Sequence, residues 1–77
     1  MGYDIAKIRE LLEAAFSEED LSNFCFDHYV SVYEQFTSGH TKSTRVRLLI
    51  TYAEKNNLID DLLIRLNQKN PHKYAEF

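Results

Sequence analysis

The junction between two amphipathic segments, LLEAAFSEEDLSNFCFD at residues 11–27, constrains the fold more than any other part of the chain. Ser17 is a good helix N-cap, and Asp20 three residues later approximates a capping box. Phe16, just before the cap, is placed to pack against Leu21 as a hydrophobic staple. One helix therefore ends as the next begins, with no glycine or proline between them, and the two meet in a tight corner.

Apolar residues elsewhere in the chain also recur at helical spacing, and two glycines and one proline are too few for a strand-rich domain. Residues 29–36 fit either a short strand or one to two helical turns. We favour a short helix, because a lone strand has no partner. Tyr74 and Phe77 are expected to return to the core from a last turn. We predict an all-α, compact bundle of about six short helices, at 4–15, 17–28, a short segment ending near 36, 41 or 43 to 55, 58–68 and 72–77.

Polar residues at the ends of the apolar segments indicate where these helices begin. Asp4 is the expected N-cap of the first helix, and its carboxylate also suits the positive end of the helix dipole. Either Thr41 or Ser43 is expected to cap the helix that ends near residue 55. Asn57 with Asp60 resembles a further N-cap, which predicts that the fifth helix begins directly after Asn57.

The length of 77 residues is that of one domain, so we expect residues 1–77 to form a single domain. Cys25 is the only cysteine, which excludes an internal disulfide and fits a reducing compartment. The N-terminal residues are charged and contain no long apolar run, so neither a secretory signal nor a membrane span is expected. These features predict a cytoplasmic protein without a membrane partner.

No group of residues indicates catalysis or cofactor binding. Cys25 and His28 have a spacing that could suit a metal, but a structural zinc site needs four ligands and only His40 and His72 remain as further histidines. Cys25 also falls on an apolar stripe, where a thiol is usually inert packing. We therefore expect no enzyme activity, no bound metal and no cofactor.

The net charge of −3 divides unevenly, because residues 1–40 carry −6 and residues 41–77 carry +3. Three acids begin the second helix, and three bases begin the fourth helix, where cations oppose the helix dipole. The six candidate partner-binding residues are Glu18, Glu19, Asp20, Lys42, Arg45 and Arg47. We expect the acids to form one face and the bases another, so that copies associate through an asymmetric acid-to-base contact.

Two further interpretations stay open. Lys42, Arg45 and Arg47 could instead contact phosphates, which makes a small helical nucleic-acid-binding domain the second candidate, although the chain is acidic and lacks a longer basic stripe. Phe26 or Tyr29 is expected off the apolar stripe of the second helix. Such an aromatic could anchor an apolar contact with a partner or pack against a neighbouring helix in the core.

Three segments that together cover most of the chain resemble the effector-associated domains of bacterial conflict systems, and the seventh type most closely. These segments are AAFSEEDLSNFCFD (14–27), VYEQFTSGHTKSTRVRLLITYAEKNN (32–57) and LIDDLLIRLNQKNPHKY (58–74). The most specific points are Phe16-Ser17, Leu21, Cys25-Phe26-Asp27, Val32-Tyr33, Lys42-Ser43, Leu48-Leu49-Ile50, Asn70-Pro71 and Tyr74. The resemblance implies a six-helix bundle of the death-like superfamily.

The resemblance also implies a role in bacterial immunity signalling. Domains of this kind resemble adaptors, with one copy fused to an effector such as a protease, a nucleotide-binding signalling ATPase or a Toll-like domain. A second copy lies on a neighbouring component, and like-with-like association couples the two. The implied partner is a homotypic or heterotypic death-like domain, self-association is included, and no enzyme activity is implied within this chain.

Overall fold

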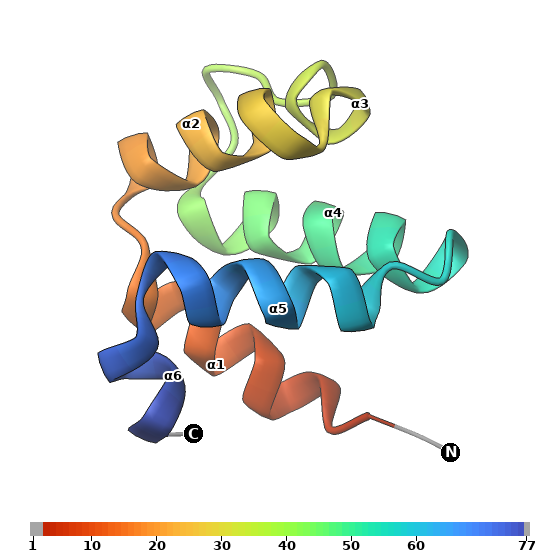
Figure 1. The fold of residues 1–77 in the computed structure, drawn as a ribbon. Coiled ribbons are helices and arrows are strands. Elements are labelled where there is room, and N and C mark those ends of the chain that lie inside the picture. The colour runs from red at the N-terminus through yellow and green to blue at the C-terminus, as the bar shows by residue number, and fades with distance from the viewer. Residues whose placement is uncertain (1–2, 77) are drawn as a thin grey trace.

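The computed structural model describes residues 3–76, and within that range the chain forms six helices and no strand (Figure 1). This confirms the predicted all-α bundle of short helices. The helices are α1 (Ile5–Ala15), α2 (Glu18–His28), α3 (Val30–Tyr33), α4 (Lys42–Lys55), α5 (Ile59–Lys69) and α6 (Pro71–Glu76). None of the helices in residues 3–76 is both long enough and apolar enough to cross a membrane.

Side-chain caps begin three of the helices, as the sequence predicted. Asp4 accepts a hydrogen bond from the Lys7 backbone N–H at 3.2 Å, and Ser17 accepts one from the Asp20 N–H at 3.1 Å. Of the two alternatives for α4, the cap is Thr41, whose hydroxyl lies 3.2 Å from the Thr44 N–H. Each such cap contributes about 1 kcal/mol to helix stability.

The prediction that Asn57 caps α5 was wrong. Asn57 has a left-handed φ of 55° and ends α4 instead. The Leu58 N–H donates to the Ala53 carbonyl at 2.7 Å and the Asn57 N–H to the Glu54 carbonyl at 3.4 Å, which is the hydrogen-bond pattern of a Schellman motif. The N-cap position of α5 is Leu58, which has no side-chain cap.

The helices are arranged with α2 and α3 at one end of the molecule, α1 and α6 at the other, and α4 and α5 between them (Figure 1). α1 packs against α4 and α6, whereas α2 packs against α3 and α4. The centre of the core is fully buried and contains Leu12, Leu21, Leu49, Leu62 and Leu66. This layout leaves the outer faces of α2–α3 and of α1–α6 on opposite sides of a shared core.

The two least regular predicted segments are also accounted for. Residues 30–33 form the predicted short helix α3, and backbone turns continue to Phe36, whose N–H donates to the Tyr33 carbonyl at 3.0 Å. At the C-terminal end, Tyr74 of α6 packs against the core as predicted. Phe77, the other aromatic expected to return to the core, lies outside the described residues.

Candidate interaction surface

The three predicted acidic residues, Glu18, Glu19 and Asp20, form the exposed first turn of α2. They lie at the tight corner with α1, and the helix dipole and the Ser17 cap explain why the turn tolerates three carboxylates. Of these three acids, only Glu18 forms an ion pair within residues 3–76, with its Oε1 3.8 Å from Arg45, and its side chain is still 59% exposed. The acidic turn is therefore available to a partner.

Lys42 binds the end of α1 rather than extending into solvent. Its Nζ donates to the Glu13 carbonyl at 2.7 Å and to the Phe16 carbonyl at 2.9 Å. Helix C-termini leave carbonyls without intrahelical partners, and a cation there also complements the helix dipole. This role explains a base at the start of α4, where its own helix dipole disfavours it.

Arg45 joins three parts of the chain. Its guanidinium donates to the Ser22 hydroxyl at 3.1 Å and to the Thr37 carbonyl at 2.9 Å, and it lies over the Phe36 ring at 5.2 Å from the centroid. The side chain is only 14% exposed, and its buried Nε has no hydrogen-bond partner among the described residues. Arg45 therefore holds α2 and the loop after α3 against α4.

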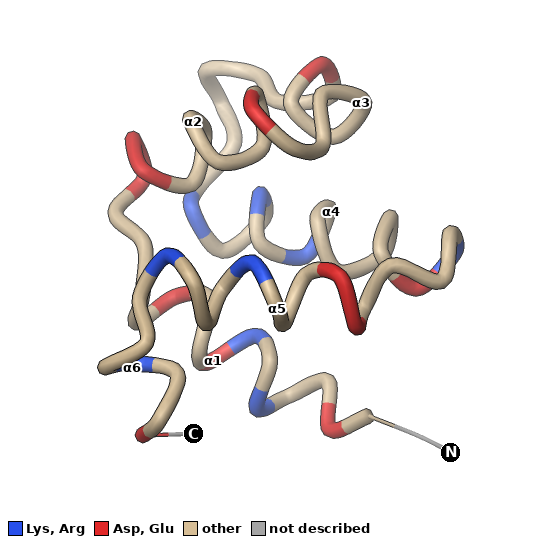
Figure 2. The backbone as a smooth tube through the Cα atoms, in the orientation of Figure 1, with Lys and Arg blue, Asp and Glu red and all other residues tan. Residues whose placement is uncertain are grey.

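Arg47 differs from the other two bases, because it is exposed and its only polar contact in residues 3–76 is a 3.5 Å approach to the Thr44 hydroxyl. The structure thus brings the acidic turn of α2 and the basic turn of α4 together at one corner, where Figure 2 shows them as neighbouring red and blue segments. Partner binding by these six residues stays a prediction, with Lys42 and Arg45 already engaged within the chain.

The two candidate aromatics are separated by the structure. Tyr29 is buried at 4% exposure, whereas Phe26 is 59% exposed. Val30 and Tyr33 of α3 are also exposed, and the Tyr33 ring meets that of Phe26 edge-on at 5.2 Å. We refer to these three side chains, Phe26, Val30 and Tyr33, as the α2–α3 apolar surface.

The sequence held a signal for this surface that our prediction missed. A four-residue helix can turn only one side to the core, and Val32 of α3 is fully buried. Val30 and Tyr33, three residues apart, are therefore left on the outer side. The neighbouring charges are acidic, because Asp27 and Glu34 are exposed and no lysine or arginine occurs between Arg9 and Lys42.

A polar network links the C-terminal end of α2 to α5. The Tyr29 hydroxyl donates to Asp61 Oδ2 at 2.7 Å, and Arg65 Nε donates to the same oxygen at 2.9 Å. These two hydrogen bonds lower the pKa of Asp61. Burial of Tyr29 and its hydrogen bond to Asp61 raise the pKa of Tyr29. Arg65 also lies 3.0 Å from His28 Nδ1. The network fixes the position of α2 against α5.

Cys25 has the properties of a packing residue. Its side chain is fully buried, and burial raises the pKa of the thiol to about 12, so it is neutral at physiological pH. His28 is exposed beside Arg65. Within residues 3–76, no group of three or more histidine, cysteine and acidic residues is placed to hold a metal ion.

Comparison with protein families identifies residues 8–71 as effector-associated domain 7. Comparisons with curated proteins and with solved structures found no significant match. The matched range begins within α1, includes all of α2 to α5 and extends to the first residue of α6. It therefore contains the acidic turn, the basic turn and the α2–α3 apolar surface. The chain belongs to the effector-associated domain 7 family.

Proposed function

We propose that this chain is a non-catalytic adaptor that couples a bacterial conflict or defence effector to a sensor or partner, in the cytoplasm, by association with like domains of the death-like superfamily. Family membership supports the coarser part of this proposal, that the domain is an accessory module attached to effectors. The finer part rests on the surface of the bundle.

The observation that carries the proposal is the α2–α3 apolar surface. Phe26, Val30 and Tyr33 stay exposed although the bundle has a complete core built from other residues. Contiguous exposed apolar side chains with a polar rim are typical of protein interaction sites, and aromatic residues often dominate the binding energy of such sites. Asp27 and Glu34 supply the polar rim.

Charge is expected to select and orient the partner. α2 and α3, with the residues between and just after them, carry five acids and neither lysine nor arginine, so a cognate domain needs a basic surface opposite them. Complementary charges increase the rate of encounter and set the register more than they add affinity. The exposed acids Glu18, Glu19 and Asp20 and the exposed base Arg47 are the proposed charged contacts; Lys42 and Arg45 act by holding the corner.

The test is binding to a sequence-related effector-associated domain encoded beside this one, measured by calorimetry at low salt. We expect Phe26→Ser to weaken binding about tenfold or more, and Glu19→Lys with Asp20→Lys to slow association. Ile64→Ser is the matched control, because Ile64 on α5 is 58% exposed and outside the proposed contact. If wild-type protein and the Phe26 variant bind equally, the proposal fails.

A duplex DNA of random sequence serves as the second ligand in the same experiment. Lys42 and Arg45 donate to acceptors within the chain, so only Arg47 of the three bases is left to meet phosphates. We therefore expect no steep, salt-dependent DNA binding. A strong DNA complex that is lost at moderate salt would instead favour the nucleic-acid-binding alternative.

A further inference from the structure

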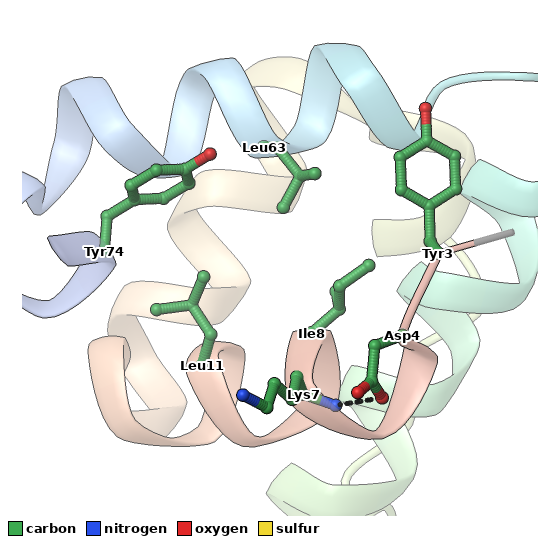
Figure 3. A pocket seen from close by; sticks show the side chains of 7 residues that line it. All are labelled: Tyr3, Asp4, Lys7, Ile8, Leu11, Leu63 and Tyr74. Atoms are coloured by element: carbon green, nitrogen blue, oxygen red, sulfur yellow. Dashed lines mark hydrogen bonds between the residues drawn. The ribbon is translucent and has the colours of Figure 1, made fainter. Parts of the chain in front are cut away.

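An apolar groove is lined by residues of α1, α5 and α6. α1 and α6 lie at the end of the molecule opposite to α2 and α3 (Figure 1). The walls of the groove are Ile8 and Leu11 of α1 and Leu63 of α5, and Tyr74 of α6 stands at one end (Figure 3). Tyr3, which donates a hydrogen bond to Asp60, stands at the other end. We refer to this feature as the α1–α5–α6 groove.

The size of the groove favours protein side chains over a small molecule. Its volume is about 250 Å³, which is below the range of about 300–1,000 Å³ that is usual for small-molecule sites. It is an open groove on the protein surface rather than an enclosed cavity, and its lining is mainly apolar. One or two aromatic or branched side chains from a protein surface match these dimensions.

The charge at the groove rim is complementary to that of the α2–α3 apolar surface. Lys7 and Asp4 both line the groove and are exposed. The Asp4 carboxylate accepts the Lys7 backbone N–H as the N-cap of α1, whereas the ion pairs found within residues 3–76 do not include the Lys7 ammonium. At the other end of the molecule, Asp27 directly follows Phe26, and neither lysine nor arginine occurs in α2 or α3. The α2–α3 apolar surface therefore has an acidic rim, and the α1–α5–α6 groove at the other end of the molecule has a lysine at its rim.

We propose that the α2–α3 apolar surface of one copy docks into the α1–α5–α6 groove of a second copy, with Phe26 and Tyr33 against the half-buried Leu63 and Tyr74, above the buried Ile8 and Leu11. This inference rests on the proposed function, because it names the surfaces through which like domains associate. Asp27 of the first copy then approaches Lys7 of the second. The edge-on contact between Phe26 and Tyr33 orders these two side chains of the α2–α3 apolar surface before binding, which lowers the entropy lost on association.

α2 and α3 lie at one end of the bundle and α1 and α6 at the other (Figure 1). Each copy can therefore use the α2–α3 apolar surface and the α1–α5–α6 groove at once. A contact between two different patches is heterologous, and it produces an open chain or a ring rather than a closed two-fold dimer. A growing chain of copies keeps a free α2–α3 apolar surface at one end and a free α1–α5–α6 groove at the other. Such assembly would gather the effectors fused to the individual copies.

The test uses the wild-type chain and two single variants in sedimentation velocity over a wide range of concentration. Wild-type protein is expected to form species that grow with concentration. Phe26→Ser removes the main aromatic of the α2–α3 apolar surface, and Leu63→Arg blocks the α1–α5–α6 groove. Each variant alone should lower the self-association affinity at least about tenfold. An equimolar mixture should form a one-to-one dimer and nothing larger, because one intact α2–α3 apolar surface and one intact α1–α5–α6 groove remain. Lys55→Ser, which changes an exposed side chain at the end of α4 that lines neither surface, should behave as the wild type.

A charge exchange provides a second test that leaves the packed residues untouched. Lys7→Glu and Asp27→Lys should each weaken self-association at low salt, and the double variant should recover it. Lys55→Glu, which changes an exposed base at the end of α4, is the control and should have no effect. These variants keep the test valid if Leu63→Arg does not fold.

Three results would overturn the inference. These are a wild-type chain that stays monomeric throughout, a mixture of the two variants that forms no dimer, and a closed wild-type dimer that is insensitive to Leu63→Arg and Lys7→Glu. If any of these occurs while the chain still binds a sequence-related domain through Phe26, the docking inference fails and the proposed function stands. If that binding is also absent, both fail.

Discussion

Replacing Lys42 by methionine tests whether this base has a structural role rather than a docking role. Methionine keeps the unbranched stem and removes the ammonium that donates to the Glu13 and Phe16 carbonyls at 2.7 and 2.9 Å. A hydrogen bond to a charged group contributes about 1.5–3 kcal/mol net. Lys42 is half-buried, so water reaches part of the freed carbonyl surface, and we expect a loss of about 2 kcal/mol in the free energy of unfolding.

Urea unfolding followed by circular dichroism measures this loss, and for a domain of this size it corresponds to a fall in Tm of about 8–16 °C. Arg47→Met is the matched control, because Arg47 is an exposed base near the start of the same helix. We expect that variant to stay within about 0.5 kcal/mol of the wild type. If Lys42→Met destabilises the chain no more than Arg47→Met does, the assignment of Lys42 as the C-terminal cap of α1 is incorrect.

Four further predictions concern stability and reactivity. The pKa of Asp61 is lower in the folded chain than its unfolded value of 3.8, so the ionised carboxylate stabilises the fold above that pH and this stabilisation is lost on acidification. Asp61→Asn should therefore flatten the decline of stability below pH 4 in acid unfolding curves. The pKa of Tyr29 is higher in the folded chain than its unfolded value of 10.0, so the neutral hydroxyl stabilises the fold below that pH and this stabilisation is lost as pH rises further. Tyr29→Phe should therefore remove the alkaline decline in stability, and it should cost about 1 kcal/mol at neutral pH. Cys25 should react with a thiol reagent only as fast as the chain unfolds, and rapid labelling of native protein would contradict its burial. Asn57→Ala should destabilise the chain by about 1 kcal/mol and Asn57→Gly should not, as measured by thermal unfolding, because glycine and asparagine adopt a φ of 55° readily and alanine does not.

The helices could be predicted from the sequence because their determinants are local. Ser17 and Thr41 bond to backbone groups three residues away, and the apolar stripes repeat within each helix. Asn57 shows the limit of such rules, since asparagine is favoured both at an N-cap and at a left-handed helix end. Only the pairing of Leu58 with Ala53 distinguishes the two, and that pairing depends on how the chain turns.

The roles of the bases could not be predicted, because their partners are distant in sequence. Lys42 reaches carbonyls 26 and 29 residues earlier in the chain, and Arg45 reaches Ser22, 23 residues earlier. A count of charges treats these bases as free, whereas packing of α4 against α1 and α2 supplies their acceptors. The exposure of Phe26 and the burial of Tyr29 likewise depend on the break between α2 and α3.

Engagement of Lys42 and Arg45 within the fold changes how binding data on this corner should be interpreted. A variant at either position removes contacts that join helices, so a loss of association would follow from a disturbed corner even if neither side chain touches a partner. Loss of binding is informative there only when the free energy of unfolding is unchanged. Phe26, Asp27 and Lys7 do not have this difficulty, because all three are exposed. Association defects at these three residues, with stability unchanged, would therefore report on the contact itself.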